Sequence, residues 1–511
     1  MSDKARPIML QGTSSHVGKS ILTAALCRIF MEHGLRVAPF KAQNMALNSF
    51  VTIDGGEIGR AQAFQAEAAG IEPTVDMNPI LLKPTSDMGS QVIVHGKVYG
   101  NMKAAEYHRF KKEAARYVLE SYRRLEEKND LIIIEGAGSP AEINLRENDI
   151  ANMGFAEMVD APVILIGDID RGGVFASLVG TMELLTASEK KRVKGFIINK
   201  FRGDFELLKP GLDFLENKTG LPVFGVVPYL EDINLPDEDG VVLESGQWSV
   251  VSGQKKITIV VIKLPRISNF TDFDPFRFEP DVSIHYITEP AKLDGADVVI
   301  IPGSKNTLED LDWLWKAGIA DRLIHYAENG GKVIGICGGF QMMGKLIKDP
   351  HGVESHVKEM KGLGLLHGET ILEKEKKTYQ VAAIIQAADN RQHTTVKGYE
   401  IHMGETAGRE HPFSIITKRN NTAVKREDGA ISANGKIWGT YIHGIFDNDA
   451  FRTGFLNEIR TDRGLPERGV ISFKDKKDEN IKTLARTIND SIDLPGLYEI
   501  MGLDFRRGPH A

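Results

Sequence analysis

A glycine-rich loop near the start of the chain lies between an apolar segment and a helical pattern. Residues 7–10 read Pro-Ile-Met-Leu, and residues 12–20 read Gly-Thr-Ser-Ser-His-Val-Gly-Lys-Ser. Apolar residues then recur at helical spacing over 21–29. A strand, a glycine-rich loop ending in Gly-Lys-Ser and a helix form the order that a phosphate-binding P-loop requires. This order predicts a parallel α/β sheet for the first half of the chain, with a nucleotide beyond the end of its first strand.

The residues of this loop predict the contacts of the nucleotide. Backbone N–H groups at the start of a helix bind phosphate oxygens, which favours ATP as the ligand. We expect Gly12, Thr13 and Gly18 to lie against the nucleotide and Lys19 to neutralise its β- and γ-phosphate oxygens. The Ser20 hydroxyl is the expected ligand of Mg²⁺. The loop is one residue longer than the common P-loop, because Gly12 stands six residues before Gly18.

Several buried strands are predicted after the loop, with a long amphipathic helix over 104–128 between two of them. Strands over 35–41, 131–135, 163–168 and 195–199 end in Lys41, Glu135, Asp168 and Asn199. Ligands of parallel sheets bind beyond the carboxyl ends of the strands. We therefore expect Lys41 to contact the nucleotide and Glu135 to hold Mg²⁺ together with Ser20. A resemblance described below implies a further magnesium ligand after the second strand, for which Glu57 is a weak candidate.

Cys337 lies at a second predicted turn between a strand and a helix. Residues 330–334 predict the strand, and the turn at 335–341 reads Gly-Ile-Cys-Gly-Gly-Phe-Gln. Glycines on both sides of a nucleophile allow a cramped turn with positive φ that pushes the side chain out of the strand end. The start of the following helix favours a reactive thiolate. We interpret Cys337 as a nucleophile rather than a buried structural cysteine.

A histidine is the expected catalytic base beside Cys337. His443 ends a short predicted strand, where it can take the thiol proton and later protonate a leaving group. His402 ends another predicted strand and is the alternative base. Gly303, in a loop after a buried strand, and Gly338 are expected to offer backbone N–H groups to an oxyanion.

Length and composition predict a two-domain protein. The chain has 511 residues, which exceeds one ordinary core. We predict a first domain over 1–235, a polar linker over 236–256, a second α/β domain over 257–455, and a helical tail over 456–511 that packs rather than catalyses. The net charge of −7 argues against a nucleic-acid partner. Two cysteines and no long apolar run predict a cytoplasmic protein without disulfides or a membrane span, and a homo-oligomer stays open.

The first half is similar to the dethiobiotin-synthetase branch of P-loop proteins, whose members use ATP to activate a carboxylate. The shared features are the nine-residue loop, the lysine that closes the second strand, and Glu-Gly-Ala-Gly at 135–138. Three further segments resemble the cobyric acid synthases, which are glutamine-dependent amidases of the cobalamin pathway. They read Pro-Phe-Lys-Ala-Gln-Asn-Met at 39–45, Asn-Pro-Ile-Leu-Leu-Lys-Pro at 78–84 and Asp-Ile-Asp-Arg-Gly-Gly at 168–173.

The second half resembles the class I glutamine amidotransferase domain, which implies a flavodoxin-like α/β fold. The resemblance rests on Gly-x-Cys-x-Gly-x-Gln around Cys337 followed by His443. It implies a γ-glutamyl thioester on Cys337, with Gln341 helping to hold its pocket. Most such domains carry a glutamate two residues after the histidine, where this chain has Ile445. We therefore predict a catalytic dyad and weak glutaminase activity in isolation, and we assign no chemistry to the family-like segments 268–275 and 399–405.

Together these resemblances imply that ATP converts carboxylates to acyl phosphates, which capture ammonia released from glutamine along an enclosed path between the domains. The implied substrate is adenosylcobyrinic acid a,c-diamide, amidated at its b, d, e and g carboxylates to adenosylcobyric acid. One alternative is a cobyrinic acid a,c-diamide synthase. A second is an amidotransferase acting on a cell-wall precursor. A third, from another class, is a P-loop ATPase switch with a non-catalytic amidotransferase-like domain.

Overall fold

The computed structural model divides the chain into two compact units. It describes residues 4–86, 89–230, 257–386, 394–409 and 411–505. The first unit comprises residues 1–45, 58–235 and 477–511, and the second comprises 46–57 and 236–476. The predicted domain bounds therefore need two corrections: residues 46–57 group with the second unit, and the end of the chain groups with the first. The predicted linker 236–256 lies outside the described residues.

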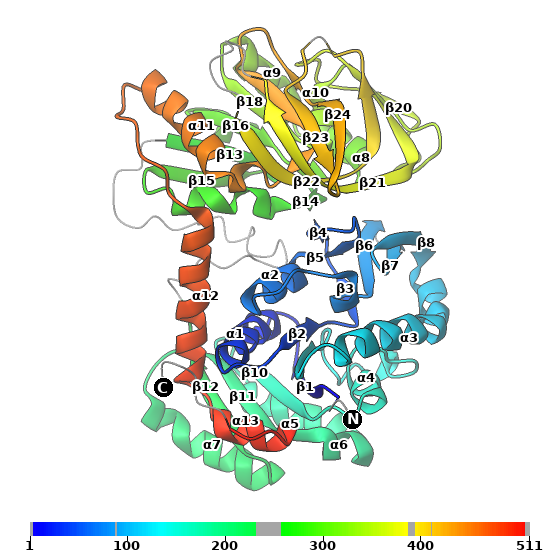
Figure 1. Cartoon of the computed structure of the whole chain (residues 1–511), viewed down its shortest axis with the longest axis vertical. Coiled ribbons are helices and arrows are strands. Elements are labelled where there is room, and N and C mark those ends of the chain that lie inside the picture. The colour runs from blue at the N-terminus through cyan, green and yellow to red at the C-terminus, as the bar shows by residue number, and fades with distance from the viewer. Residues whose placement is uncertain (1–3, 87–88, 231–256, 387–393, 410, 506–511) are drawn as a thin grey trace. The chain divides into compact units, whose positions relative to one another are not determined.

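A six-stranded parallel sheet forms the centre of the first unit (Figure 1). In the order β12-β11-β10-β1-β9-β2, its strands are Val223–Pro228, Val193–Phe201, Val163–Asp168, Arg6–Gly12, Leu131–Glu135 and Val37–Phe40. The central strands are apolar throughout because both faces of the sheet are covered. Since β1 pairs with β9 on one side and β10 on the other, the loop after β1 lies among the carboxyl ends of neighbouring strands. The predicted P-loop α/β fold is confirmed.

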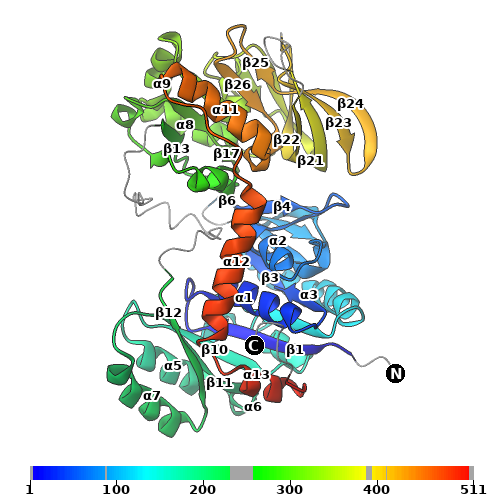
Figure 2. The same ribbon diagram turned by 60° about the vertical axis from the view of Figure 1, so that its left-hand side comes forward.

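Helices cover the two faces of this sheet. They are α1 (Lys19–Glu32), α2 (Arg60–Ala68), α3 (Ala104–Glu126), α4 (Met153–Met158), α5 (Val174–Leu184), α6 (Ala187–Arg192), α7 (Phe205–Thr219), α12 (Phe473–Asn489) and α13 (Leu494–Met501). Residues of α3, α4, α5 and α7 share one apolar core, and α1 shares the other with α12 and α13 (Figure 2). Leu484 and Leu497 of the predicted tail are fully buried in that second core. The end of the chain therefore completes the nucleotide-binding unit.

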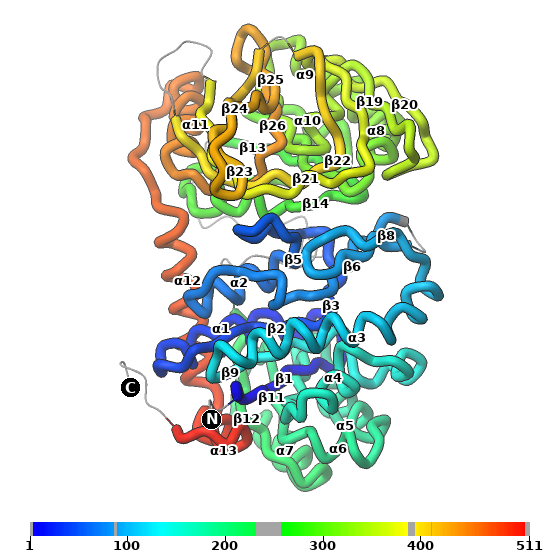
Figure 3. The backbone as a smooth tube through the Cα atoms, turned by 45° about the vertical axis from the view of Figure 1, so that its right-hand side comes forward, coloured from blue at the N-terminus to red at the C-terminus, as the bar shows by residue number. Residues whose placement is uncertain are grey.

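Two smaller sheets follow β2 along the chain. The first has the order β3-β6-β7-β8, with bounds Gln43–Met45, Ile80–Ser86, Gly89–Val94 and Lys97–Lys103. The second is the pair β4 (Ser49–Val51) and β5 (Glu57–Gly59). Figure 3 follows the backbone from β3 through β4 and β5 into α2. We call residues 46–57 the inserted segment, because the chain leaves the first unit at its start and returns at its end.

The second unit contains a mostly parallel sheet and a larger, mostly antiparallel one. The parallel sheet has the order β15-β13-β16-β18-β26-β25, with bounds Val282–Ile287, Ile257–Ile262, Val298–Ile301, Lys332–Ile336, Ile437–Thr440 and Ala430–Ile431. The other sheet contains β19 (Leu346–Lys348), β20 (Glu359–Lys361), β21 (Glu369–Ile385), β22 (Thr395–Ala407), β23 (Ser414–Arg419), β24 (Thr422–Asp428) and β27 (Ile442–His443). Strands β14 (Ile267–Ser268) and β17 (Gly303–Ser304) form a separate, short antiparallel pair. The helices are α8 (Thr307–Lys316), α9 (Ile319–Glu328), α10 (Gly338–Met343) and α11 (Asp449–Asp462), with 3-10 turns at Phe270–Phe278 and Ile445–Asp447. The predicted α/β fold of the second half is confirmed.

Two buried arginines fasten α11 to the chain that follows the 3-10 turn Phe270–Phe278. Arg452 Nε donates to Glu279 Oε1 at 3.0 Å, and Arg460 Nη2 donates to Asp281 Oδ1 at 2.8 Å. Both arginines are fully buried. A buried charge without its partner is costly, so these pairs fix the position of the chain at 279–281.

We expect Arg452→Ala to destabilise the second unit by about 3–5 kcal/mol, because the buried charge of Glu279 would keep only its 3.5 Å contact with Arg460. The measurement is the free energy of unfolding in urea, followed by tryptophan fluorescence. The control is Lys316→Ala, which breaks the exposed pair with Asp312 and should cost less than about 1 kcal/mol. Equal losses in the two variants would contradict this account of the buried pair.

Candidate active site

The loop between β1 and α1 encloses the amine of Lys19. Lys19 Nζ donates to the carbonyl oxygens of Ser14 and Gly138, each at 3.1 Å. A Cβ atom at Gly12 would lie 2.9 Å from this amine and 2.5 Å from Val17, so only glycine fits there. Gly18 begins the helix with φ of 98°, a left-handed conformation that glycine adopts without strain. The structure thus forms the predicted P-loop with its lysine held inside it.

The ends of β10 and β11 support this loop. Asn199 Nδ2 donates to Val17 O at 2.7 Å. Lys200 Nζ donates to His16 O and to Asp168 Oδ2, both at 2.7 Å. The polar residues predicted at the strand ends therefore meet around the loop.

Glu135 is the centre of a buried polar cluster beside the loop. Its Oε1 accepts from Ser20 Oγ at 2.8 Å and from Lys41 Nζ at 2.9 Å, and its Oε2 accepts from Gln65 Nε2 at 2.6 Å. Glu135 is 1% exposed, and the cation of Lys41 offsets the cost of burying its charge. The sequence predicted Lys41 and Ser20 at this site but not Gln65.

The Ser20 hydroxyl and the Glu135 carboxylate fit a magnesium ion, because both are hard oxygen ligands and lie together. No group of three or more His, Cys, Asp or Glu residues within the described ranges forms a metal cluster. The other ligands of Mg²⁺ would thus be phosphate and water oxygens, as is usual for this ion. Glu57, the weaker candidate, forms an ion pair with Lys376 of β21 instead.

Cys337 occupies the turn between β18 and α10. Its φ of 52° is the positive value that the sequence predicted. A Cβ atom at Gly339 would come within 2.0 Å of Ile301 O, so the backbone approaches β16 too closely for any larger residue. Cys337 Sγ donates to Ile401 O at 3.6 Å, and the residue is 7% exposed. The side chain is thus at a strained elbow, nearly but not fully enclosed.

His443 lies between Cys337 and a carboxylate that the sequence analysis did not identify. His443 Nδ1 lies 2.6 Å from Asp272 Oδ2, and the backbone N–H of Gly444 donates to Asp272 Oδ1 at 3.0 Å. Cys337 raises the pKa of His443, so it also lies near this ring. The sequence analysis predicted only a dyad and missed Asp272 because it searched for the acid only after the histidine.

The charge state of His443 follows from these neighbours. Burial lowers the pKa of His443, but the charges of Asp272 and Cys337 and the hydrogen bonds to both raise it further, to about 10. The imidazolium form is stabilised between two groups that can carry negative charge. A histidine held in this way can keep a thiolate and supply a proton.

Segment 268–275, to which the sequence assigned no chemistry, carries Asp272 on the 3-10 turn Phe270–Phe278. The only signal in the sequence was the pair of acids in Asn-Phe-Thr-Asp-Phe-Asp. Spacing alone did not place either acid near His443.

Gly303, Gly338 and Gln341 also lie near the triad. A Cβ atom at Gly303 would lie 3.2 Å from His443 Cε1, and one at Gly338 would lie 2.9 Å from the backbone nitrogen of Ser304. Gln341 Oε1 accepts from Thr307 Oγ1 at 3.1 Å. These contacts place the three residues where their predicted roles require, and the roles themselves stay predictions.

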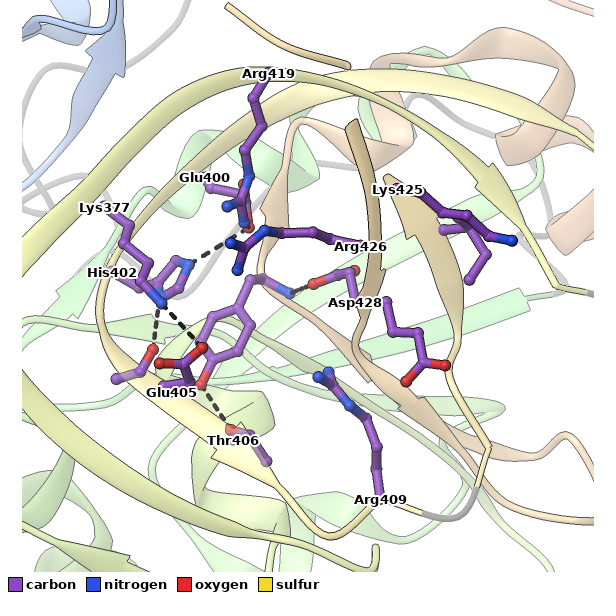
Figure 4. A pocket seen from close by; sticks show the side chains of 14 residues that line it. Lys377, Glu400, His402, Glu405, Thr406, Arg409, Arg419, Lys425, Arg426 and Asp428 are labelled. Carbon is purple, nitrogen blue, oxygen red and sulfur yellow. Dashed lines mark hydrogen bonds and ion pairs between the residues drawn. The ribbon is translucent and has the colours of Figure 1, made fainter. Parts of the chain in front are cut away.

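The alternative base, His402, lines a cavity of about 420 Å³ on the antiparallel sheet (Figure 4). His402 Nδ1 lies 2.7 Å from Gly404 O, and its ring stacks on Tyr441. Arg419 binds Glu400 in the same cavity through two hydrogen bonds, at 2.7 and 2.8 Å. Tyr441 OH also accepts from Gln341 Nε2 at 3.3 Å, so the cavity adjoins the predicted glutamine-binding residue. The structure favours His443 over His402 as the base.

The fold and the site define a glutamine amidotransferase joined to a nucleotide-binding domain. Residues 258–451 match the family described as "CobB/CobQ-like glutamine amidotransferase domain". Residues 8–242 match the "CobQ/CobB/MinD/ParA nucleotide binding domain" family.

Proteins named cobyric acid synthase match almost the whole chain. The protein from Clostridium tetani is 53% identical over 98% of this chain and 100% of its own length. Those from Caldanaerobacter subterraneus and Syntrophobacter fumaroxidans are 50% and 49% identical over 97% and 98% of this chain, and over 99% and 100% of their own lengths. The chain belongs to the cobyric acid synthase family, which confirms the resemblance seen in the sequence. Its two domains fit a glutamine-hydrolysing ligase.

Among solved structures, PurLQS from Thermotoga maritima aligns with 45% of this chain and 98% of its own, at 17% identity and a TM-score of 0.29. That likeness is too small to support an argument. Among the described helices, none combines the length and the apolar character that crossing a bilayer demands.

The two cysteines are expected to differ in reactivity. Cys27 is fully buried in α1, and burial together with the charge of Glu135 raises its pKa. We expect iodoacetamide to modify Cys337 at least about tenfold faster than Cys27 in the native protein. Peptide mass mapping measures both rates, and Cys337→Ser is the control that should leave the native chain unlabelled. Equal rates at both cysteines would contradict the assignment of Cys337 as the accessible thiol.

The raised pKa of His443 predicts a pH-dependent stability. The folded state binds this proton more tightly than the unfolded chain, whose histidine has its ordinary pKa of 6.5. The resulting stabilisation is complete below pH 6.5 and is lost as the pH rises towards 10. We expect the free energy of unfolding to fall more steeply over this range in the natural protein than in Asp272→Asn, where the pKa of His443 falls. Urea unfolding at several pH values measures both slopes, and identical slopes would contradict the ion pair.

Proposed function

We propose that this chain uses ATP and glutamine to amidate the b, d, e and g carboxylates of adenosylcobyrinic acid a,c-diamide, giving adenosylcobyric acid. The observation that carries the proposal is the 2.6 Å contact of His443 Nδ1 with Asp272 Oδ2, together with Cys337 at the turn between β18 and α10. Residues of the second unit can release ammonia from glutamine, and the P-loop of the first unit can bind the ATP that activates a carboxylate. The chain therefore has the parts for both half-reactions. The corrin substrate rests on the family to which the chain belongs.

Glutamine is hydrolysed at Cys337 in two steps. The thiolate attacks the amide carbon of glutamine, and the oxyanion is stabilised by backbone N–H groups near Gly303 and Gly338. The C–N bond breaks as His443 gives its proton to the nitrogen, which leaves as ammonia. His443 then removes a proton from water, which attacks the thioester and releases glutamate. Asp272 holds the imidazole in the orientation that both proton transfers need.

The released ammonia reacts at the nucleotide-binding unit. A carboxylate of the substrate attacks the γ-phosphorus of ATP, and ADP leaves, which forms an acyl phosphate. Lys19 and the N–H groups at the start of α1 bind the transferred phosphate, and Ser20 and Glu135 would hold Mg²⁺. A bound Mg²⁺ supplies positive charge to the β- and γ-phosphate oxygens. Ammonia then displaces phosphate to give the amide, provided that it arrives unprotonated.

The alternatives are less well supported. An ATPase switch with a non-catalytic second domain has no use for the hydrogen bond between His443 and Asp272. A cobyrinic acid a,c-diamide synthase would use the same chemistry on a different substrate, so the substrate decides between the two.

The defining experiment incubates the protein with ATP, Mg²⁺, glutamine and adenosylcobyrinic acid a,c-diamide, and then measures the mass of the corrin. Each conversion of a carboxyl to an amide lowers the mass by about one unit, so a fully amidated product is about four units lighter. A parallel reaction with cobyrinic acid tests the alternative substrate. Amidation of cobyrinic acid alone would contradict the proposed substrate.

We expect Cys337→Ser to lower glutamine-dependent amidation by about three orders of magnitude, because the thioester cannot form. The same variant should keep amidation driven by added ammonium chloride, since the nucleotide-binding unit is intact. Lys19→Ala is the matched variant and should lose both reactions. Glutamine-dependent amidation that survives in Cys337→Ser would show that another group is the nucleophile.

A further inference from the structure

The inserted segment, residues 46–57, contacts the part of the second unit that carries the acid of the triad. Asn48 Oδ1 accepts from the backbone N–H of Phe270 at 3.2 Å. The backbone N–H of Ser49 donates to Asn269 Oδ1 at 2.9 Å. Two consecutive residues of the inserted segment thus bind two consecutive residues just before Asp272.

These contacts are fully enclosed. Asn48, Ser49 and Asn269 are each 1–2% exposed. Val51 of the inserted segment packs in a small apolar cluster with Tyr399 and Ile401 of β22. Polar groups buried to this degree are costly to separate from their partners, so the inserted segment is a fixed part of this region rather than a loose loop.

Asn269 carries the contact onward to the catalytic residues. Its φ of 54° is left-handed. A residue other than glycine keeps this conformation only where the surrounding structure supports it. Asn269 O accepts from the backbone N–H of Asp272 at 3.0 Å, and Asn269 Nδ2 lies 3.5 Å from both ring nitrogens of His443. The orientation of Asp272 and His443 therefore depends on Asn269.

Tyr399 gives a second route from the inserted segment to His443. Its hydroxyl donates to Ser49 O at 3.3 Å, and its ring stacks on the imidazole of His443 with centroids 5.2 Å apart. One side of the imidazole is therefore packed against a ring that the inserted segment holds.

We propose that the inserted segment is a positioning element of the glutaminase site. Asn48 and Ser49 hold Asn269, and through it Asp272 and His443, in their working arrangement. This inference rests on the proposed function of the triad and adds to it residues from the nucleotide-binding half of the sequence.

The test compares full-length natural protein with Asn48→Ala, which removes the acceptor for Phe270 N–H. The rate of glutamine hydrolysis and the rate of ammonia-dependent amidation are both measured for each protein. The matched control is Asn434→Ala, since Asn434 Oδ1 also accepts a backbone N–H, that of Lys436 at 3.0 Å, in the turn between β25 and β26.

We expect Asn48→Ala to lower kcat for glutamine hydrolysis about tenfold while KM stays within about twofold, because one hydrogen bond that orients the triad is lost. Asn434→Ala should keep the natural kcat. Ammonia-dependent amidation should not change in either variant. Tyr399→Phe keeps the ring on His443 but removes the hydrogen bond to Ser49 O, so it should lower kcat by about threefold. This second variant tests the inference even if Asn48→Ala does not fold.

Two results would overturn the inference. The first is a natural kcat in Asn48→Ala. The second is an equal loss of kcat in Asn48→Ala and Asn434→Ala. Glutamine hydrolysis that persists in Cys337→Ser would instead refute the proposed function itself, so the two failures are distinguishable.

Discussion

The ion pair between His443 and Asp272 is the interaction on which the chemistry of the second unit depends. It joins the end of β27 to a 3-10 turn that lies 171 residues earlier in the chain. It offsets the cost of burying a cation, and so allows an imidazolium to lie beside Cys337 at neutral pH. Much of the surrounding structure secures the acid: the buried pairs of Arg452 and Arg460 hold the chain just after the turn, and the inserted segment holds the chain just before it.

The connectivity of the chain ties the two chemistries together. The chain leaves the nucleotide-binding unit after β3, contributes residues 46–57 to the second unit, and returns to place Gln65 on Glu135. At its other end, α12 and α13 come back to complete the core behind α1. If each unit were one continuous stretch of sequence, residues 46–57 would belong to the first unit and residues 477–511 to the second.

The sequence predicted what is local and missed what is distant. Gly12, Lys19, Glu135 and Cys337 stand at turns between strands and helices, where glycine spacing and apolar runs reveal the backbone, and the structure places them as expected. Asp272 was missed because its partner is far away in the sequence and no periodicity links a 3-10 turn to β27. Residues 46–57 were missed for the same reason, since short strands give little pattern and the partner of the buried Asn48 lies more than 200 residues further along the chain. The long strand β21 was missed because its charged, partly exposed residues hide the alternation that marks a strand, and β22 was predicted only up to His402.

The central claim is that nitrogen freed at Cys337 is the nitrogen captured by the carboxylate that ATP has activated. The direct measurement supplies glutamine labelled with nitrogen-15 in its amide, together with an excess of unlabelled ammonium, and determines the isotope in the amidated corrin by mass spectrometry. The account predicts a product that carries nitrogen-15, because ammonia passes to the acyl phosphate without mixing with the solvent. A product with the isotope content of the added ammonium would contradict it.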